Sequence, residues 1–189
     1  MPVPAADSRP VLVAFGDSLS AGFGAEPGAS YPDFLQKELD SKGLAYRVAN
    51  LGISGDTTSG GLSRVPSALD LKPRFVILEL GGNDGLRGLP LSQTRANLDA
   101  MIRRFTGAGA RVVVAGMTLP PNYGPDYVRQ FEAIYVDLAR EHKLTRIPFL
   151  LEGVWDVPGL MQADGIHPTA KGNAEIARRV MKIVEPLLR

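Results

Sequence analysis

The sequence has no cysteine and only two histidines, His142 and His167, among its 189 residues. Without cysteine, the chain has neither disulfide bonds nor thiolate metal ligands. No apolar run approaches the roughly 20 residues that a transmembrane helix requires. Basic and acidic residues are nearly balanced, 21 against 20, which leaves no electrostatic patch for nucleic acid or an anionic membrane surface. We therefore expect no nucleic-acid partner and no integral membrane association.

The first ten residues, Met1–Pro10, are polar and rich in proline, and they predict an irregular N-terminal extension. They lack the basic start and apolar core of a secretory leader. We expect a periplasmic or secreted protein if a leader has been removed, and a cytoplasmic one otherwise. The chain contains no linker, internal repeat or low-complexity segment, so its length indicates a single domain over residues 1–189.

Short apolar runs alternate with amphipathic helical patterns along the chain, which is typical of an α/β fold with a parallel sheet. The expected strands are Val11–Phe15, Tyr46–Leu51, Phe75–Leu80, Arg111–Met117 and Arg146–Leu150. The expected helix starts are Ser30 with a capping box to Asp33, Thr57 or Thr58 with a kink or restart at Pro66, Ser92, Asp126 and Thr169. The helix from Asp126 should extend to Lys143.

The first apolar run ends in a tight turn, Gly16-Asp17-Ser18. Chemistry in parallel sheets collects at the carboxyl ends of the strands, where this turn should lie. Glycine allows the sharp turn, and the amides of a following helix favour a developing negative charge. Ser18 is therefore a candidate nucleophile. A helix-cap role for Asp17 or Ser18 explains the turn equally well. The local pattern therefore leaves open whether the turn supplies a cap or a nucleophile.

A serine nucleophile needs a general base, and His167 is the better of the two histidines. It follows Asp164 by three positions in a turn, where a carboxylate reaches the near ring nitrogen and fixes the tautomer. Taken alone, the pair is also compatible with an ordinary loop. His142 lies in a charged segment and is expected to be a solvated helix end. Glu79, at the end of a strand, is interpreted as a partnered structural group rather than a catalytic carboxylate.

Gly55 and Asn83 each follow an expected strand end and should lie on the same edge as Ser18. A Gly55 amide and an Asn83 side chain would suit an oxyanion hole, although both residue types are also routine in turns. The proline-rich loop Thr118–Pro125 is a substrate lid or merely a stiff connection. In the irregular segment Leu151–Ala163, Trp155 and Met161 line a pocket or cover the core.

Together these residues resemble the GDSL or SGNH hydrolase family. The matching blocks, in family order, are Gly16-Asp17-Ser18-Leu19, Gly55, Gly82-Asn83-Asp84 and Asp164-Gly165-Ile166-His167. Longer strings at 50–57, 79–88 and 119–124 are similar to the bacterial arylesterase, acyl-CoA thioesterase and lysophospholipase branch.

The resemblance implies a three-layer α/β/α sandwich, flavodoxin-like, with a five-stranded parallel sheet. It implies a catalytic triad of Ser18, Asp164 and His167, and an oxyanion hole built from the Ser18 and Gly55 amides and the Asn83 side chain. In that branch the loop that borders the acyl site corresponds to Leu119, Pro120, Pro121, Asn122, Tyr123 and Gly124.

We therefore expect a serine esterase that cleaves carboxylic esters and thioesters through an acyl-enzyme. Aryl esters, acyl-CoA and lysophospholipid-like molecules are the small-molecule substrates that the resemblance implies. The alternatives are a carbohydrate O-acetyl esterase and a non-catalytic acyl-binding module. No G-x-S-x-G elbow, phosphate loop or dinucleotide fingerprint follows the first strand, so no cofactor is expected. The scattered carboxylates and histidines form no recognisable metal-ligand set.

Overall fold

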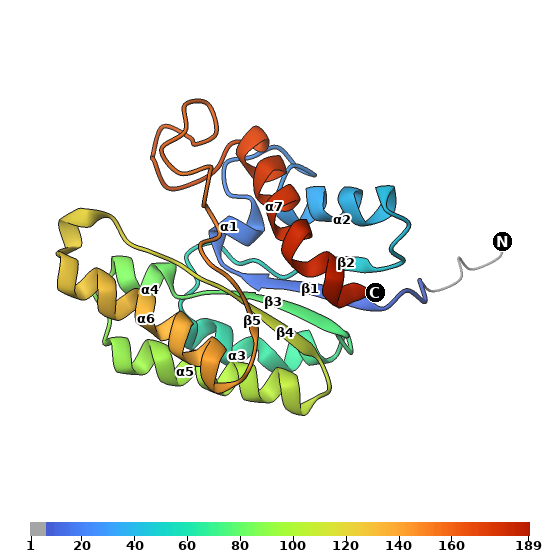
Figure 1. The fold of residues 1–189 in the computed structure, drawn as a ribbon, viewed down its shortest axis with the longest axis horizontal. Coiled ribbons are helices and arrows are strands. Elements are labelled where there is room, and N and C mark those ends of the chain that lie inside the picture. The colour runs from blue at the N-terminus through green and yellow to red at the C-terminus, as the bar shows by residue number, and fades with distance from the viewer. Residues whose placement is uncertain (1–6) are drawn as a thin grey trace.

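The structure, a computed structural model, describes residues 7–189 as a sheet between two layers of helices (Figure 1). Over this range the sheet has five strands, all parallel, in the order β2-β1-β3-β4-β5. The strands are β1 (Val11–Gly16), β2 (Arg47–Asn50), β3 (Phe75–Glu79), β4 (Arg111–Ala115) and β5 (Thr145–Ile147). This order confirms the predicted flavodoxin-like α/β/α sandwich.

Helices connect the strands and cover both faces of the sheet. They are α1 (Ser18–Ala21), α2 (Tyr31–Ser41), α3 (Thr58–Leu69), α4 (Gly82–Leu86), α5 (Leu91–Gly107), the 3-10 turn η1 (Pro121–Tyr123), α6 (Pro125–Glu141) and α7 (Ala170–Leu188). Figure 1 shows α2 and α7 on one face and α3, α5 and α6 on the other. Within residues 7–189, no helix is long and apolar enough to cross a membrane.

The expected caps are confirmed at three helices. Ser30 and Asp33 form a reciprocal capping box at α2, Thr57 is the cap of α3, and Thr169 caps α7. The prediction for Ser92 is wrong, because α5 begins at Leu91 after Pro90. Pro90 has a φ of −57°, which already matches a helix, so the chain enters α5 before Ser92.

The predicted break at Pro66 does not divide α3, which continues from Thr58 to Leu69 with Pro66 inside it. The helix beyond Pro66 keeps its bonding, since the Asp70 amide donates to the Pro66 carbonyl. A proline removes a single N–H donor, and a helix packed on a core tolerates that loss.

The core lies between the sheet and its helices. Every residue of β1 and of β3 is buried, as expected for central strands of a parallel sheet with helices on both faces. On one face, Phe15 packs edge-to-face against Phe105 of α5 at a centroid distance of 5.3 Å. This rigid centre fixes where β1 and β3 end, and thus where the turns after them begin.

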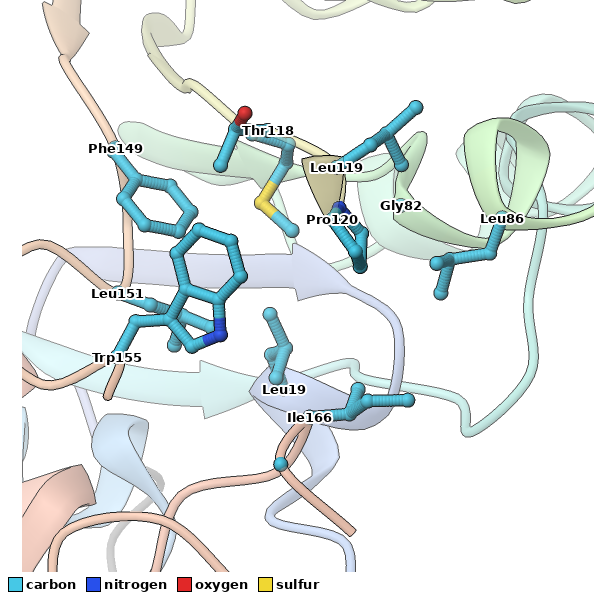
Figure 2. Close-up of a pocket in the computed structure, with 12 residues that line it drawn as sticks. Leu19, Gly82, Leu86, Thr118, Leu119, Pro120, Phe149, Leu151, Trp155 and Ile166 are labelled. Atoms are coloured by element: carbon cyan, nitrogen blue, oxygen red, sulfur yellow. The ribbon is translucent and has the colours of Figure 1, made fainter. Parts of the chain in front are cut away.

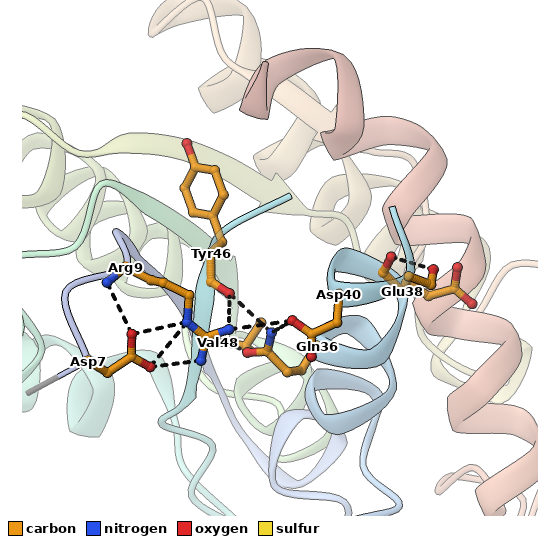
Figure 3. A network of polar contacts seen from close by, with 8 residues as sticks. Asp7, Arg9, Gln36, Glu38, Asp40, Tyr46 and Val48 are labelled. Atoms are coloured by element: carbon orange, nitrogen blue, oxygen red, sulfur yellow. Dashed lines mark hydrogen bonds and ion pairs between the residues drawn. The ribbon is translucent and has the colours of Figure 1, made fainter. Parts of the chain in front are cut away.

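The edge strand β2 is covered by polar contacts from α2 and the N-terminal segment (Figure 3). Gln36 accepts from the Val48 amide at 2.7 Å and donates to the Tyr46 carbonyl at 3.1 Å. Arg9 reaches the same carbonyl at 3.3 Å and is paired with Asp7 at 2.7 Å. These bonds occupy part of the free edge of the sheet. The predicted irregular extension falls mostly on residues 1–6, which lie outside the described range.

Candidate active site

The carboxyl ends of β1 and β3 form the topological switch point of the sheet. The chain leaves β1 to build β2 on one side, and β3 then pairs with β1 on the other side. Connections that diverge in this way open a crevice at the strand ends, where α/β proteins bind ligands. The turn after β1 carries Ser18, and α4 after β3 carries Asn83.

Three predicted residues meet at this crevice. The Ser18 hydroxyl Oγ lies 2.9 Å from Nε2 of His167, although the two residues are 149 positions apart in the sequence. Nδ1 of His167 lies 2.7 Å from Oδ2 of Asp164. Because a carboxylate only accepts, Nδ1 carries the hydrogen and donates it, and Nε2 is left to accept from the serine hydroxyl. This is the tautomer that a serine nucleophile requires.

Asp164 is held by its own turn. Its Oδ1 accepts from the Ile166 and His167 amides at 2.9 and 3.0 Å, which leaves Oδ2 directed at the imidazole. Desolvation raises the pKa of Asp164, but the hydrogen bonds from His167 and Ile166 outweigh it and lower the pKa to about 2. Asp164 therefore stays ionised beside His167 over the neutral pH range.

The structure assigns the helix cap to Asp17, which leaves the Ser18 hydroxyl free of that role. Asp17 is the N-cap of α1, and its Oδ1 accepts from the Leu19 amide at 3.0 Å. Ser18 is the first residue of α1 and directs its hydroxyl toward His167. The cap thus fixes the turn, and the neighbouring serine is left to react.

The predicted oxyanion donors surround the same turn. Within residues 7–189, the Ser18 and Gly55 amides make no hydrogen bond to another part of the chain, so both N–H groups are available. Nδ2 of Asn83 donates to Asp17 Oδ2 at 3.1 Å and to the Asp56 carbonyl at 2.9 Å. Asn83 therefore ties the loop of Gly55 to the turn of Ser18, and it must share one of these hydrogens to reach an oxyanion.

Arg64, which the sequence patterns did not identify, clamps the two loops together. It donates to the Gly16 carbonyl at 2.8 Å and the Leu51 carbonyl at 2.7 Å, and it pairs with Asp56 at 2.7 Å. Its guanidinium also lies 4.0 Å from the centroid of the Phe15 ring. One side chain of α3 thus fixes the ends of β1 and β2. The only sequence signal was a basic residue in the second turn of α3.

Two buried carboxyl groups support α4 and the turn. Asp84 accepts from the Thr58 amide at 2.8 Å and its hydroxyl at 2.5 Å, which joins α4 to the start of α3. Glu79 accepts from the Asp17 amide at 3.2 Å and the Ser20 hydroxyl at 2.7 Å. The interpretation of Glu79 as a partnered structural group is thereby confirmed.

An apolar pocket opens beside Leu19, the residue that follows Ser18 (Figure 2). It is lined by Leu19, Gly82, Leu86, Met117, Thr118, Leu119, Pro120, Phe149, Leu151, Trp155, Gly165 and Ile166. Leu19, Gly82 and Ile166 are the chain neighbours of Ser18, Asn83 and His167, so the pocket adjoins the reactive groups. Trp155 lines it, whereas Met161 packs against the core and bridges to Pro168.

The predicted acyl-site loop contributes to this pocket only through Leu119 and Pro120. Its remaining residues, Pro121, Asn122, Tyr123 and Gly124, are not among the lining residues, because η1 turns the chain away. The Tyr123 hydroxyl instead donates to the Leu86 carbonyl at 2.8 Å. That bond holds the loop against the C-terminal end of α4.

His142 is not the solvated helix end that the sequence predicts. It is the C-cap of α6, and its Nε2 lies 2.6 Å from Oδ1 of Asp99 on α5. Its side chain is only 17% exposed. The sequence around His142 is charged and gives no sign of Asp99 as its partner. The packing of α6 on α5 brings the two side chains together. Within residues 7–189, no cluster of three potential metal ligands occurs.

Comparison with known proteins places this geometry among related chains. Residues 14–175 match the model of the GDSL-like lipase/acylhydrolase family. The esterase TesA of Pseudomonas aeruginosa is 45% identical over 178 residues, covering 94% of this chain and 89% of that protein. Thioesterase 1/protease 1/lysophospholipase L1 of Escherichia coli is 41% identical over 178 residues, covering 94% and 84%. A crystal structure of TesA superposes with a TM-score of 0.90 at 44% identity, covering 94% and 99%.

Proposed function

Because this chain belongs to the GDSL-like lipase/acylhydrolase family, we propose that it cleaves carboxylic esters and thioesters through an acyl-enzyme formed on Ser18. The chain is a hydrolase, and its named relatives are an esterase and a thioesterase/lysophospholipase. The observation that carries the proposal is the continuous path from Ser18 through His167 to Asp164, with contacts of 2.9 and 2.7 Å.

In the first half-reaction, Ser18 Oγ attacks the carbonyl carbon while its proton moves to Nε2 of His167. Asp164 stabilises the resulting imidazolium through the bond to Nδ1. The tetrahedral intermediate then collapses, and the alcohol or thiol leaves with the proton from His167. In the second half-reaction, His167 takes a proton from water, the hydroxide attacks the acyl carbon, and the carboxylic acid is released as Ser18 recovers its proton.

The oxyanion is stabilised by donors that are in place before the substrate arrives. The Ser18 and Gly55 amides and the Asn83 side chain take this role in the proposal. Such preorganised donors act where negative charge develops and need no reorganisation during the reaction. Their positions are supported by the bonds from Asn83 to Asp17 and Asp56.

The acyl group is proposed to occupy the apolar pocket beside Ser18. Its walls are aliphatic and aromatic side chains, including Leu86, Phe149 and Trp155 (Figure 2). Burial of apolar chain contributes about 0.8 kcal/mol for each methylene group. The lining therefore favours an acyl chain over a polar sugar. The leaving group would lie on the open side, near the exposed Phe23 ring, whose centroid is 4.6 Å from that of His167.

The proposal is tested with nitrophenyl esters of increasing acyl length, acyl-CoA thioesters and acetylated sugars. We expect kcat/KM to rise with acyl length beyond acetate, and turnover to fall by about 10³-fold or more in Ser18→Ala. Ser41→Ala, at the exposed end of α2, is the matched serine control. Activity confined to acetylated sugars would favour the carbohydrate esterase instead, and full activity in Ser18→Ala would reject the mechanism.

A further inference from the structure

Two buried carboxyl groups, those of Asp17 and Glu79, lie at the turn that carries Ser18. Asp17 is 2% exposed and Glu79 is 0% exposed, and Glu79 is the one glutamate among the buried polar residues of the described chain. Glu79 packs so closely on the turn that a Cβ at Gly16 would overlap its Oε2 atom. Buried carboxylates require hydrogen-bond donors or cations, so the partners of each oxygen decide its charge state.

The two oxygens of Glu79 have different surroundings. Oε2 accepts from the Asp17 amide at 3.2 Å and from the Ser20 hydroxyl at 2.7 Å. The Ser20 hydroxyl in turn lies 3.2 Å from the Tyr31 hydroxyl, which can donate to it. Oε1 is buried, and within residues 7–189 no donor faces it. Oε2 is therefore the acceptor oxygen, and Oε1 lacks the partner that an ionised carboxylate needs.

The missing partner is explained if Oε1 carries a proton. Glu79 lies directly against Asp17, since its Oε2 accepts from the Asp17 main-chain amide at 3.2 Å. Both oxygens of Asp17 already accept, Oδ1 from the Leu19 amide and Oδ2 from Asn83 Nδ2. Asp17 thus behaves as the ionised member of the pair. A bond between two carboxyl groups needs one proton, and Glu79 is the member with an oxygen free to hold it.

The groups facing Glu79 offer it no positive charge. Tyr31 on α2 and Tyr135 on α6 are neutral phenols, and Asp17 is an acid. Arg64 on α3 is bound to Asp56 and to main-chain carbonyls. The charge of His167 acts on Asp17 instead, and it lowers the pKa of that carboxyl group against the larger opposing effect of burial. Burial, followed by the negative charge of Asp17, raises the pKa of Glu79 well above its usual value.

We propose that Glu79 stays protonated during catalysis and donates a hydrogen bond to the Asp17 carboxylate, which makes it a positioning residue for both Ser18 and Asn83. This inference rests on the proposed function, since it assigns a role within the same site. Oε2 of neutral Glu79 accepts from the Asp17 amide. In this proposal the O–H at Oε1, the oxygen left without another partner in the described chain, is the donor to the Asp17 carboxylate. Asp17 then holds the start of α1 and the Asn83 amide.

Loss of this proton would place two negative charges in contact in a buried site. The pair would repel, Asp17 would release Asn83, and a second charge would stand beside the developing oxyanion. The protonated form is the active one and the folded pKa is raised. Activity attributable to Glu79 is therefore present at neutral pH and lost as the pH rises through the upper pKa of the pair.

An infrared spectrum at pH 7 tests the charge state without using activity. We expect a C=O stretch from a protonated acid that shifts on labelling with ¹³C-carboxyl glutamate and disappears in Glu79→Gln. Glu141→Gln, at an exposed glutamate paired with Arg95, is the matched control and should keep the band. Absence of a glutamate acid band in the labelled wild-type protein would overturn the inference, even if no variant folds.

Kinetics test the positioning role. Glutamine keeps an acceptor for the Asp17 amide and supplies an N–H to its carboxylate, so Glu79→Gln should retain kcat within about threefold at pH 7, whereas Glu79→Ala should lose about 10- to 100-fold. Deprotonation of Glu79 should lower the activity of the wild type at alkaline pH. Glu79→Gln should not show this loss of activity. A folded but inactive Glu79→Gln would overturn the inference, while an active Ser18→Ala would reject the proposed function instead.

Discussion

The molecule contains two histidine–aspartate pairs that are nearly identical as pairs. His167 lies 2.7 Å from Asp164, and His142 lies 2.6 Å from Asp99. The imidazole side chains are 15% and 17% exposed. The pairs differ in the ring nitrogen that meets the carboxylate. His167 contacts Asp164 through Nδ1 and faces Ser18 through Nε2 at 2.9 Å, whereas His142 contacts Asp99 through Nε2 and is the C-cap residue of α6.

The comparison shows that an imidazole paired with an aspartate does not necessarily face a serine hydroxyl. Asp99 is shared with Arg103, which lies 2.8 Å away, so this pair works as a clip between α5 and α6. Within residues 7–189, Asp164 accepts hydrogen bonds only from main-chain amides and from the His167 ring. In this described range, the His167–Asp164 pair also adjoins the apolar pocket and the proposed oxyanion donors, whereas His142 lies between α5 and α6.

The largest contrast should come from the histidines themselves. His167→Ala removes the base for Ser18 and should lower turnover by at least about 10³-fold. His142→Ala removes only the helix clip, and its turnover should stay near the wild-type value. Steady-state kinetics on a nitrophenyl ester, with both variants shown to be folded by circular dichroism, measure the difference. Equal losses in the two variants would show that the wrong histidine has been assigned.

The aspartates should repeat the contrast more weakly. Asp164→Asn leaves an acceptor near His167 but removes the charge that stabilises the imidazolium, so kcat should fall by about 10²- to 10⁴-fold. Asp99→Asn should leave kcat unchanged and lower the thermal midpoint slightly, as expected for a partly exposed ion pair. A loss of kcat in Asp99→Asn similar to that in Asp164→Asn would remove the distinction between the pairs.

The surroundings of the catalytic pair give a third, smaller effect. Asn83→Ala removes one oxyanion donor and should lower kcat by about 10²- to 10³-fold while KM changes little. His142 has no equivalent neighbour. If KM rose and kcat did not change, Asn83 would be a binding group and the oxyanion assignment would be wrong.

Acid titration should give the smallest effect, and the two pairs should respond alike. Desolvation raises the pKa of Asp164, but its hydrogen bonds prevail and hold it at about 2, below its usual 3.8. The bond from Arg103 chiefly lowers the pKa of Asp99. A depressed folded pKa contributes stability above the unfolded value that is lost as the pH falls through the folded value.

Chemical denaturation between pH 5 and about pH 2 measures this loss. Asp164→Asn and Asp99→Asn should each flatten the fall in stability below pH 3.8, the usual pKa of both groups. Only Asp164→Asn should also reduce activity at neutral pH. An unchanged pH slope in both variants would mean that neither carboxyl contributes through its charge.

The sheet was predicted correctly, and the candidate site residues could be selected, because their signals are local. Each strand is a short apolar run, the caps of α2, α3 and α7 are particular side chains before a helix, and the blocks around Ser18, Asn83 and His167 match a family pattern. The predicted start of α5 at Ser92 was wrong, since Pro90 is equally able to begin a helix.

The sequence patterns did not predict contacts between elements that are far apart in the chain. The partner of His142 lies 43 positions away on another helix, and that of Glu79 lies 59 positions away in α1. The clamp formed by Arg64 joins loops that no periodicity relates. Likewise, the pocket takes Phe149 and Trp155 from an irregular segment whose path depends on packing rather than on a repeating pattern.

The most direct test of the account is covalent labelling with an organophosphate, followed by peptide mass mapping. The base and the oxyanion donors converge on a single serine, so we predict one adduct per chain, located on Ser18, with loss of esterase activity in proportion to labelling. Labelling should be absent in Ser18→Ala and strongly slowed in His167→Ala, but normal in His142→Ala. An adduct on another residue, or full labelling of His167→Ala, would contradict the assignment of Ser18 and His167 as nucleophile and base.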